Sequence, residues 1–133
     1  DRMPRTLEFI FDFASPNAYL AWRVLPELVA RTGVTLEVTP CLLGGLFKLT
    51  GNQAPMTAFA GVKGKLDYEA LETRRFVERH GLTRFRMNPH FPLNNLMATR
   101  GLVAAQMDGH GEPYLEAVSV ATWEDGLKTD DPE

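Results

Sequence analysis

The stretch LEFIFDFASPNAYLAW, residues 7–22, changes from a strand pattern to a helix pattern within a few residues. Leu7–Phe13 is almost continuously apolar, which is typical of a strand that is buried on both faces in a parallel sheet. Ser15 has the chemistry of a helix N-cap, and Pro16 stands where a first helical residue is expected. We therefore predict a strand that ends at this corner and a helix that continues to about Arg31.

A second strand and a largely helical segment are expected to follow. VTLEV, residues 34–38, alternates in polarity and is rich in β-branched residues, which is typical of a strand. Strand, helix and strand in this order predict a right-handed βαβ unit with two parallel strands. The later pattern predicts a short helical turn within 44–52, a helix over 56–80, a stiff loop at PHFPLNN (89–95), and helices over 95–108 and 112–123.

The composition indicates one globular domain with a modest core, since 44% of the 133 residues are hydrophobic and 23% are charged. A net charge of -3 gives no reason to expect a nucleic-acid partner, and no apolar run approaches the roughly 20 residues that a membrane span needs. The single Cys41 cannot form an intramolecular disulfide and fits a reducing compartment, so we expect a cytoplasmic protein. The three histidines are too sparse for a metal site, and no metal is expected.

Ser15 has two possible roles at the corner between strand and helix. The start of a helix offers unpaired N–H donors and about half a positive charge, so it can bind an anion such as a thiolate. A serine hydroxyl at this position could donate a hydrogen bond to a bound sulfur and lower the pKa of that thiol. The simpler alternative is that Ser15 only caps the helix.

Three blocks of the sequence resemble a known family. FDFASPNAYLA (11–21), PCLLGGLFKLTGN (40–52) and NPHFPLNNLMATR (88–100) are similar to 2-hydroxychromene-2-carboxylate isomerases, which belong with kappa-class glutathione transferases in the thioredoxin-like superfamily. The resemblance implies an α/β fold with a thioredoxin-like βαβ part over 1–43, a helical insertion domain over 44–125, and the start of a return linker over 126–133. It also implies that the C-terminal thioredoxin half, which contributes to glutathione binding in the family, is absent from this chain.

The resemblance implies a glutathione-dependent isomerase. Such an enzyme converts 2-hydroxychromene-2-carboxylate to trans-o-hydroxybenzylidenepyruvate in the breakdown of naphthalene-type aromatic compounds. Ser15 aligns with the catalytic serine of the family, which holds the sulfur of glutathione as a thiolate. Glutathione is the expected cofactor, a small aromatic compound is the expected substrate, and a homodimer is the expected assembly, without a nucleic-acid or membrane partner.

Other site residues follow from the same alignment. Asn52 and Lys48 are expected to bind glutathione together with Ser15. The residues expected to contact substrate are Tyr19, Phe47, Asn94 and Asn95. All of them except Asn95 have a simpler alternative: a turn residue for Asn52, a solvated cation for Lys48, core packing for Phe47 and Tyr19, and helix capping for Asn94.

Two other functions stay open. A kappa-like glutathione transferase that acts on another electrophile would use the same site. A non-catalytic, truncated thioredoxin-like module would instead bind a partner through an exposed sheet edge. A disulfide oxidoreductase is disfavoured because Ser15 provides no thiol at the corner.

Overall fold

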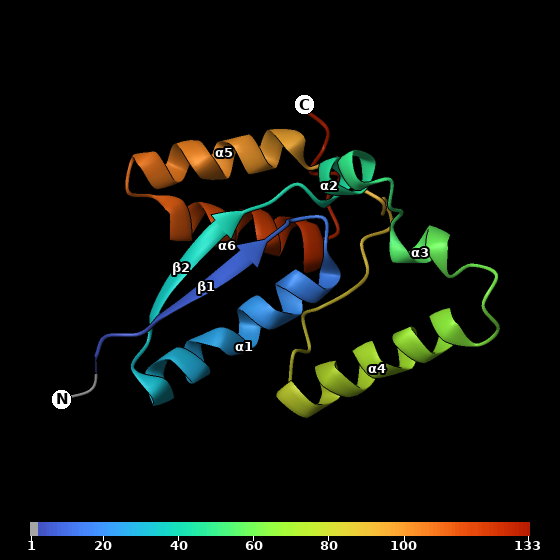
Figure 1. The fold of residues 1–133 in the computed structure, drawn as a ribbon, viewed down its shortest axis with the longest axis horizontal. Coiled ribbons are helices and arrows are strands. Elements are labelled where there is room, and N and C mark those ends of the chain that lie inside the picture. The colour runs from blue at the N-terminus through green and yellow to red at the C-terminus, as the bar shows by residue number, and fades with distance from the viewer. Residues whose placement is uncertain (1–2) are drawn as a thin grey trace. The chain divides into compact units, whose positions relative to one another are not determined.

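The structure is a computed structural model, and it describes residues 3–133. The elements in chain order are β1 (Thr6–Phe11), α1 (Pro16–Thr32), β2 (Thr35–Pro40), α2 (Leu43–Thr50), α3 (Pro55–Ala58), α4 (Lys65–His80), α5 (Leu96–Met107) and α6 (Gly111–Trp123). The fold is α/β, with one βαβ unit followed by helices, as the sequence predicted (Figure 1).

The two strands and the helix between them begin and end where local chemistry directs. β1 and β2 pair in parallel, with Leu7 opposite Leu36 in the register. Ser15 is the N-cap of α1, with a proline in its first turn. Gly33 ends the helix with φ 70, a left-handed conformation that glycine adopts without a steric penalty, and its N–H donates to Val29 O at 2.9 Å.

The prediction that the first strand is buried on both faces is wrong. Phe9 and Phe11 point into the core, whereas Ile10 is 62% exposed and Glu8 is exposed as well. The reason is that α1, α5 and α6 supply the apolar side chains that cover one face of the sheet, as the core cluster shows. In the described part of the chain the other face carries Ile10 together with threonine and glutamate side chains, and Thr39 Oγ1 donates to Glu8 Oε1 at 2.7 Å.

The predicted helix over 56–80 is also wrong, because the structure divides it. α3 ends at Ala58 and α4 begins at Lys65, and residues 59–64 between them are not helical. Gly64 has φ 77, which a right-handed helix does not accommodate. Apolar residues at helical spacing therefore did not decide the local structure, and Phe59 and Val62 are exposed.

The chain divides into two compact units. One contains the residues up to Cys41 together with Arg84–Glu133, and the other contains Leu42–Thr83. The first unit includes the sheet, α1, α5 and α6, and the second includes α2, α3 and α4. The domain boundaries expected from the family resemblance stay a prediction.

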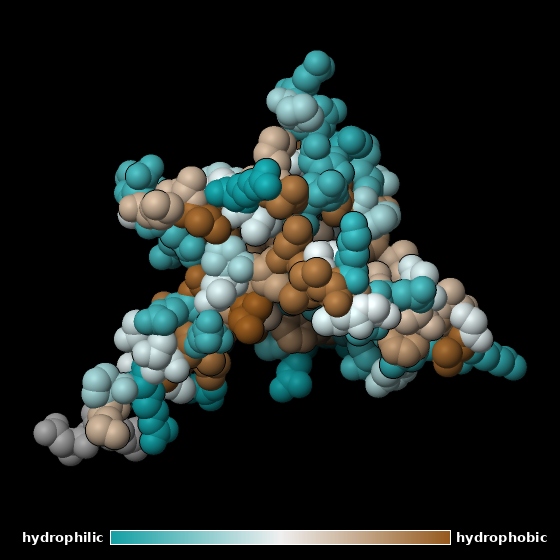
Figure 2. Space-filling model, turned by 45° about the horizontal axis from the view of Figure 1, so that its top comes forward, coloured by the Kyte–Doolittle hydropathy of each residue, from teal (hydrophilic) through white to brown (hydrophobic). Residues whose placement is uncertain are grey.

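The core of the first unit is built from the sheet and three helices. Phe11, Leu102 and Leu115 are each 1% exposed, and Trp123 is fully buried. The indole Nε1 of Trp123 donates to Phe13 O at 2.9 Å, so this buried ring has a partner for its only polar atom. Apolar side chains also remain on the surface, where Figure 2 shows them in brown among polar residues.

We expect Leu102→Ala to lower the free energy of unfolding by about 2–5 kcal/mol, because it removes buried contacts and leaves a cavity. Met107→Ala is the matched control, since this residue lies on the same helix but is 83% exposed. Chemical denaturation monitored by circular dichroism measures both variants. Equal stability of the two variants would contradict the observed core.

Candidate functional site

Ser15 caps α1 in the structure. Its Oγ accepts a hydrogen bond from Ala18 N at 3.2 Å, and its own N–H donates to Asp12 O at 3.1 Å. The side chain is half-buried, so it is neither sealed in the core nor fully solvated. Because the cap uses an oxygen lone pair, the hydroxyl hydrogen of Ser15 remains able to donate to a ligand.

The electrostatics of the first turn of α1 favour an anion. The helix is 17 residues long and has no acidic residue in its first turn. Pro16 has no N–H, and helical geometry leaves the N–H of Asn17 without an intrahelical acceptor. Together with the helix dipole, these groups can stabilise a negative sulfur or oxygen beside Ser15.

Asp12 is a site residue that the sequence interpretation missed. Its side chain is buried, with 3% exposure, and its Oδ1 accepts from Ala14 N at 2.7 Å. The same Oδ1 accepts from Nδ2 of Asn95, which also donates to Thr99 Oγ1 at 3.3 Å. The available signal was an acidic residue inside the apolar run LEFIFDF.

Tyr19 is 2% exposed, and its hydroxyl is engaged inside the first unit. The hydroxyl donates to Glu124 Oε2 at 2.9 Å and accepts from Arg23 Nε at 3.2 Å, and the ring stacks on Phe85. Burial, together with the hydrogen bond to Glu124, raises the pKa of Tyr19 above its ordinary value. This arrangement fits the packing alternative, and a contact between Tyr19 and substrate stays a prediction.

Arg23 extends this network from α1 to α6. Its guanidinium forms ion pairs with Glu124 and with Glu116, the latter at 2.7 Å, and Trp22 Nε1 donates to Glu116 at 3.1 Å. Burial alone would lower the pKa of Arg23, but its bonds to Tyr19 and the two glutamates outweigh this effect and raise it. The network therefore joins α1 to α6 at a position that lies further along α1 than the Ser15 corner.

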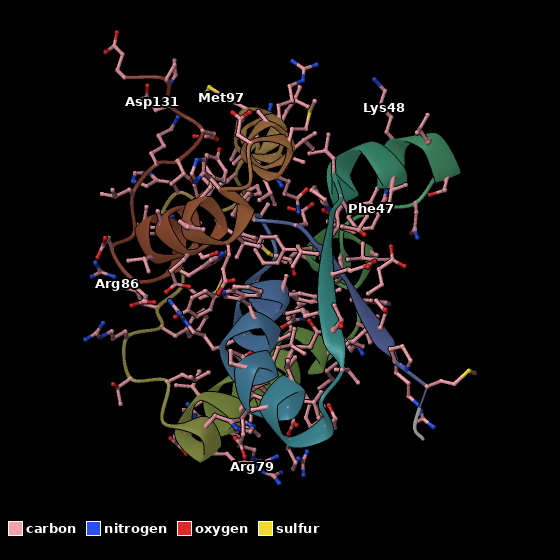
Figure 3. The ribbon with its side chains drawn as sticks, turned by 90° about the vertical axis from the view of Figure 1, so that its left-hand side faces the viewer. Phe47, Lys48, Arg79, Arg86, Met97 and Asp131 are labelled. Carbon is pink, nitrogen blue, oxygen red and sulfur yellow. The ribbon has the colours of Figure 1, made fainter. Side chains whose placement is uncertain are left out.

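Asn94 and Asn95 are neighbours with different surroundings. Asn94 is exposed, its Oδ1 accepts from Leu96 N at 3.2 Å, and its N–H donates to Asp130 Oδ2 at 3.1 Å. It borders a surface groove of about 600 Å³ that is also lined by Leu96, Met97, Arg100, Lys128, Asp130 and Pro132. Figure 3 shows Met97 extending outward from α5. The side chain of Asn95, in contrast, is turned inward to Asp12.

The remaining predicted site residues belong to the second unit. Phe47 is half-buried and Lys48 is exposed on α2, and Figure 3 shows the two side chains on different sides of that helix. Asn52 lies just after α2, where its N–H donates to Phe47 O at 2.8 Å and its Oδ1 accepts from Gln53 N at 2.8 Å. These contacts are those of a turn residue, and the ligand roles of Phe47, Lys48 and Asn52 stay predictions.

Cys41 and the acidic side chains do not form an evident reactive centre. Cys41 is half-buried, and burial, together with the charge of Asp12, raises the pKa of its thiol, which disfavours the nucleophilic thiolate. Among residues 3–133, no three side chains of histidine, cysteine, aspartate or glutamate are grouped so that they could hold a metal ion. Over the same range, no helix is long and apolar enough to cross a membrane.

Comparison with known proteins identifies related chains. The family model described as a DSBA-like thioredoxin domain matches residues 6–133. A 2-hydroxychromene-2-carboxylate isomerase from Pseudomonas putida is 27% identical over 126 residues, which cover 93% of this chain and 59% of the relative. Glutathione S-transferase kappa 1 from Rattus norvegicus is 31% identical over 123 residues, which cover 90% of this chain and 52% of the relative.

A solved structure gives the same result. A structure of 2-hydroxychromene-2-carboxylate isomerase matches with a TM-score of 0.75 and 25% sequence identity, covering 95% of this chain and 60% of that chain. The present chain thus spans about half to three fifths of the length of these relatives. These matches confirm the fold and the resemblance that the three sequence blocks indicated.

We expect Glu116→Gln to reduce stability at neutral pH by about 1 kcal/mol or less, because the side chain is partly solvated. Burial alone would raise the pKa of Glu116, but hydrogen bonds from Arg23 and Trp22 lower it below the ordinary 4.5. Because the pKa of Glu116 is lower in the folded protein than in the unfolded chain, its carboxylate stabilises the fold at pH values above the unfolded-state pKa. This stabilisation is lost as the pH falls through the folded-state pKa.

Denaturation of the unaltered protein and of Glu116→Gln, at pH values from 7 downward, therefore measures the difference between their free energies of unfolding. We expect this difference to disappear at pH values below the ordinary carboxyl range. Glu27→Gln is the control, because Glu27 is an exposed residue of α1. A difference for Glu116→Gln that stays constant, or that widens in acid, would show that its carboxylate does not stabilise the fold through Arg23 and Trp22.

Proposed function

The chain belongs to the DSBA-like thioredoxin domain family, and on this basis we propose that it forms the Ser15 half of a glutathione-dependent isomerase site. The proposed reaction converts 2-hydroxychromene-2-carboxylate to trans-o-hydroxybenzylidenepyruvate. Its relatives are named for enzymes, an isomerase and a glutathione transferase, which supports an enzymatic role. The observation on which the proposal depends is the half-buried Ser15 hydroxyl at the start of a 17-residue helix.

The groups around Ser15 fit the sulfur of glutathione. The hydroxyl of Ser15 can donate while its oxygen caps α1, and the N–H of Asn17 is a second donor at the helix start. No acidic residue in the first turn opposes a negative sulfur. Glutathione, when bound, would supply a nucleophilic thiolate that adds reversibly to the conjugated substrate. The work of this chain is to hold that sulfur ionised and in a fixed position.

The other proposed contacts are less direct. Asn52 and Lys48 would hold the peptide and carboxylates of glutathione, and Phe47 and Asn94 would face the aromatic substrate. Tyr19 and Asn95 are each less than a tenth exposed, and their contact with the substrate stays a prediction. The chain spans about three fifths of the length of the Pseudomonas putida isomerase and of the solved isomerase structure, so the proposal assigns only this part of the site to residues 1–133.

A glutathione transferase that acts on another electrophile is the second candidate. The match to Glutathione S-transferase kappa 1 is higher in identity than the match to the Pseudomonas putida isomerase, 31% against 27%. Both candidates need the same thiolate at Ser15 and differ only in its acceptor. Parallel assays of chromene isomerisation and of conjugation to a general electrophile therefore separate them.

We expect Ser15→Ala to lower kcat/KM for the isomerisation by about 10²–10³-fold, the usual effect of losing one preorganised donor to an anion. We also expect the pKa of the bound glutathione thiol to rise, since the charged sulfur loses a hydrogen bond. Steady-state kinetics and the ultraviolet absorbance of the thiolate across pH measure the two effects.

Ser15→Asp separates catalysis from capping. Aspartate is as good an N-cap as serine, so this variant should keep the thermal stability of the protein, whereas Ser15→Ala should lose about 1 kcal/mol. The carboxylate repels a thiolate, so activity should be at least as low as in Ser15→Ala. Near-normal turnover by either variant would reduce Ser15 to a cap.

The proposed enzyme is cytoplasmic and homodimeric, as expected for an isomerase of this family with a single cysteine. Sedimentation of the full-length protein tests the dimer. If the full-length protein neither isomerises the chromene nor conjugates an electrophile, the non-catalytic binding module becomes the better explanation.

A further inference from the structure

Asp12 places two kinds of acceptor at the corner that precedes α1. Its buried carboxylate accepts from Ala14 N at 2.7 Å, and its backbone carbonyl accepts from Ser15 N at 3.1 Å. One residue therefore fixes the N–H groups of both residues immediately before the helix. A carboxylate that is only 3% exposed needs such donors, since burial of an unpaired charge is costly.

Asn95 reaches the same carboxylate from a distant part of the chain. It occupies the N-cap position of α5, where an asparagine side chain usually accepts from the second or third helical N–H. Its side chain makes no such cap bond and instead donates from Nδ2 to Asp12 Oδ1, across 83 positions of sequence. The side chain of Asn95 therefore joins the corner to α5, where the same Nδ2 also donates to Thr99 Oγ1 at 3.3 Å, and it caps no helical N–H.

We infer that Asp12 and Asn95 form a positioning pair that holds the Ser15 corner against the start of α5. The inference rests on the proposed role of Ser15, because the pair would act on bound glutathione only through that residue. Hydrogen bonds weaken steeply when their geometry is distorted. A loosened corner should therefore raise the pKa of the bound thiol. If Asp12 acted only through its charge, its removal would instead lower the pKa of the bound thiol, because a nearby anion disfavours the thiolate.

A double-mutant cycle separates these two effects. Asn95→Ala removes the donor, Asp12→Ala removes the acceptor, and the double variant removes both. Asp12→Asn is the conservative variant, since its amide oxygen can still accept from Ala14 and Asn95. Asp108→Ala is the matched control, because this aspartate is the exposed C-cap of the same α5 helix.

The measurements are the pKa of the bound thiol, from thiolate absorbance, and kcat and KM for the chromene, all in the full-length protein. For each single alanine variant we expect a rise of about one pKa unit and a fall of about tenfold in kcat/KM, mostly in kcat. The double variant should be no worse than the worse single variant. Asp12→Asn should stay within about threefold of the unaltered protein, and Asp108→Ala should match it.

A lowered thiol pKa in the double variant would overturn the inference and show that Asp12 acts by charge alone. Additive losses in the cycle would also overturn it, because the two residues would then act independently. If Asp12→Ala fails to fold, Asn95→Ala and Asp12→Asn still decide, since the inference requires a rise in thiol pKa for the first and little change for the second.

Hydrogen exchange distinguishes a failure of this inference from a failure of the proposed function. Asn95→Ala leaves the acceptor of the Ala14 N–H in place, so faster exchange at Ala14 and Ser15 in this variant reports loss of the pair itself. If the unaltered protein has no glutathione-dependent activity but this exchange accelerates, the positioning pair stands and the proposed function falls. Unchanged exchange at both amides would overturn the pair whatever the activity.

Discussion

The buried carboxylate of Asp12 is the constraint on which the first unit depends most. It stands where β1 ends, and through it the backbone of the turn, the start of α1 and the start of α5 are held at one point. Trp123, from the last turn of α6, adds an indole hydrogen bond to Phe13 O in the same turn. A strand, three helices and the Ser15 hydroxyl therefore share one anchored junction, and buried polar networks of this kind specify a single arrangement when every member is satisfied.

The charged side chains of α1 lie beyond its first turn. The first turn has no acidic side chain, so the positive end of the helix dipole remains available beside Ser15. Further along, Arg23 pairs with Glu116 of α6 and with Glu124, the C-cap residue of that helix. The pair with Glu124 is the better protected one, since that carboxylate is only 7% exposed whereas Glu116 is 43% exposed. The helix is thus fixed at its side by ion pairs and at its start by the acceptors of Asp12. Its own first turn carries no carboxylate that would compete with an anion bound there.

Local chemistry explains which elements the sequence predicted well. Ser15 and Gly33 act within one turn of their own positions, so the bounds of α1 followed from capping rules. The parallel βαβ unit followed from the order of strand, helix and strand along the chain. Whether the first strand is buried on one face or on both did not follow from the sequence. An apolar residue such as Ile10 does not itself indicate which face of the strand a distant helix will cover. The prediction of one continuous helix over 56–80 failed for a related reason. Apolar residues at helical spacing mark a possible buried face of a helix, but they do not show whether another element packs against that face.

By itself, the sequence determined the family, the position of Ser15 at a helix start and the absence of a cysteine from the turn before that helix. Only the tertiary structure decided that Tyr19 is buried against Glu124 and that Asn95 turns inward while Asn94 stays at the surface. The role of Asp12 also became visible only when its partner 83 positions away was known. The physical reason is that caps and turns are satisfied by backbone groups a few residues away, whereas a buried side chain takes its partners from whichever elements pack beside it.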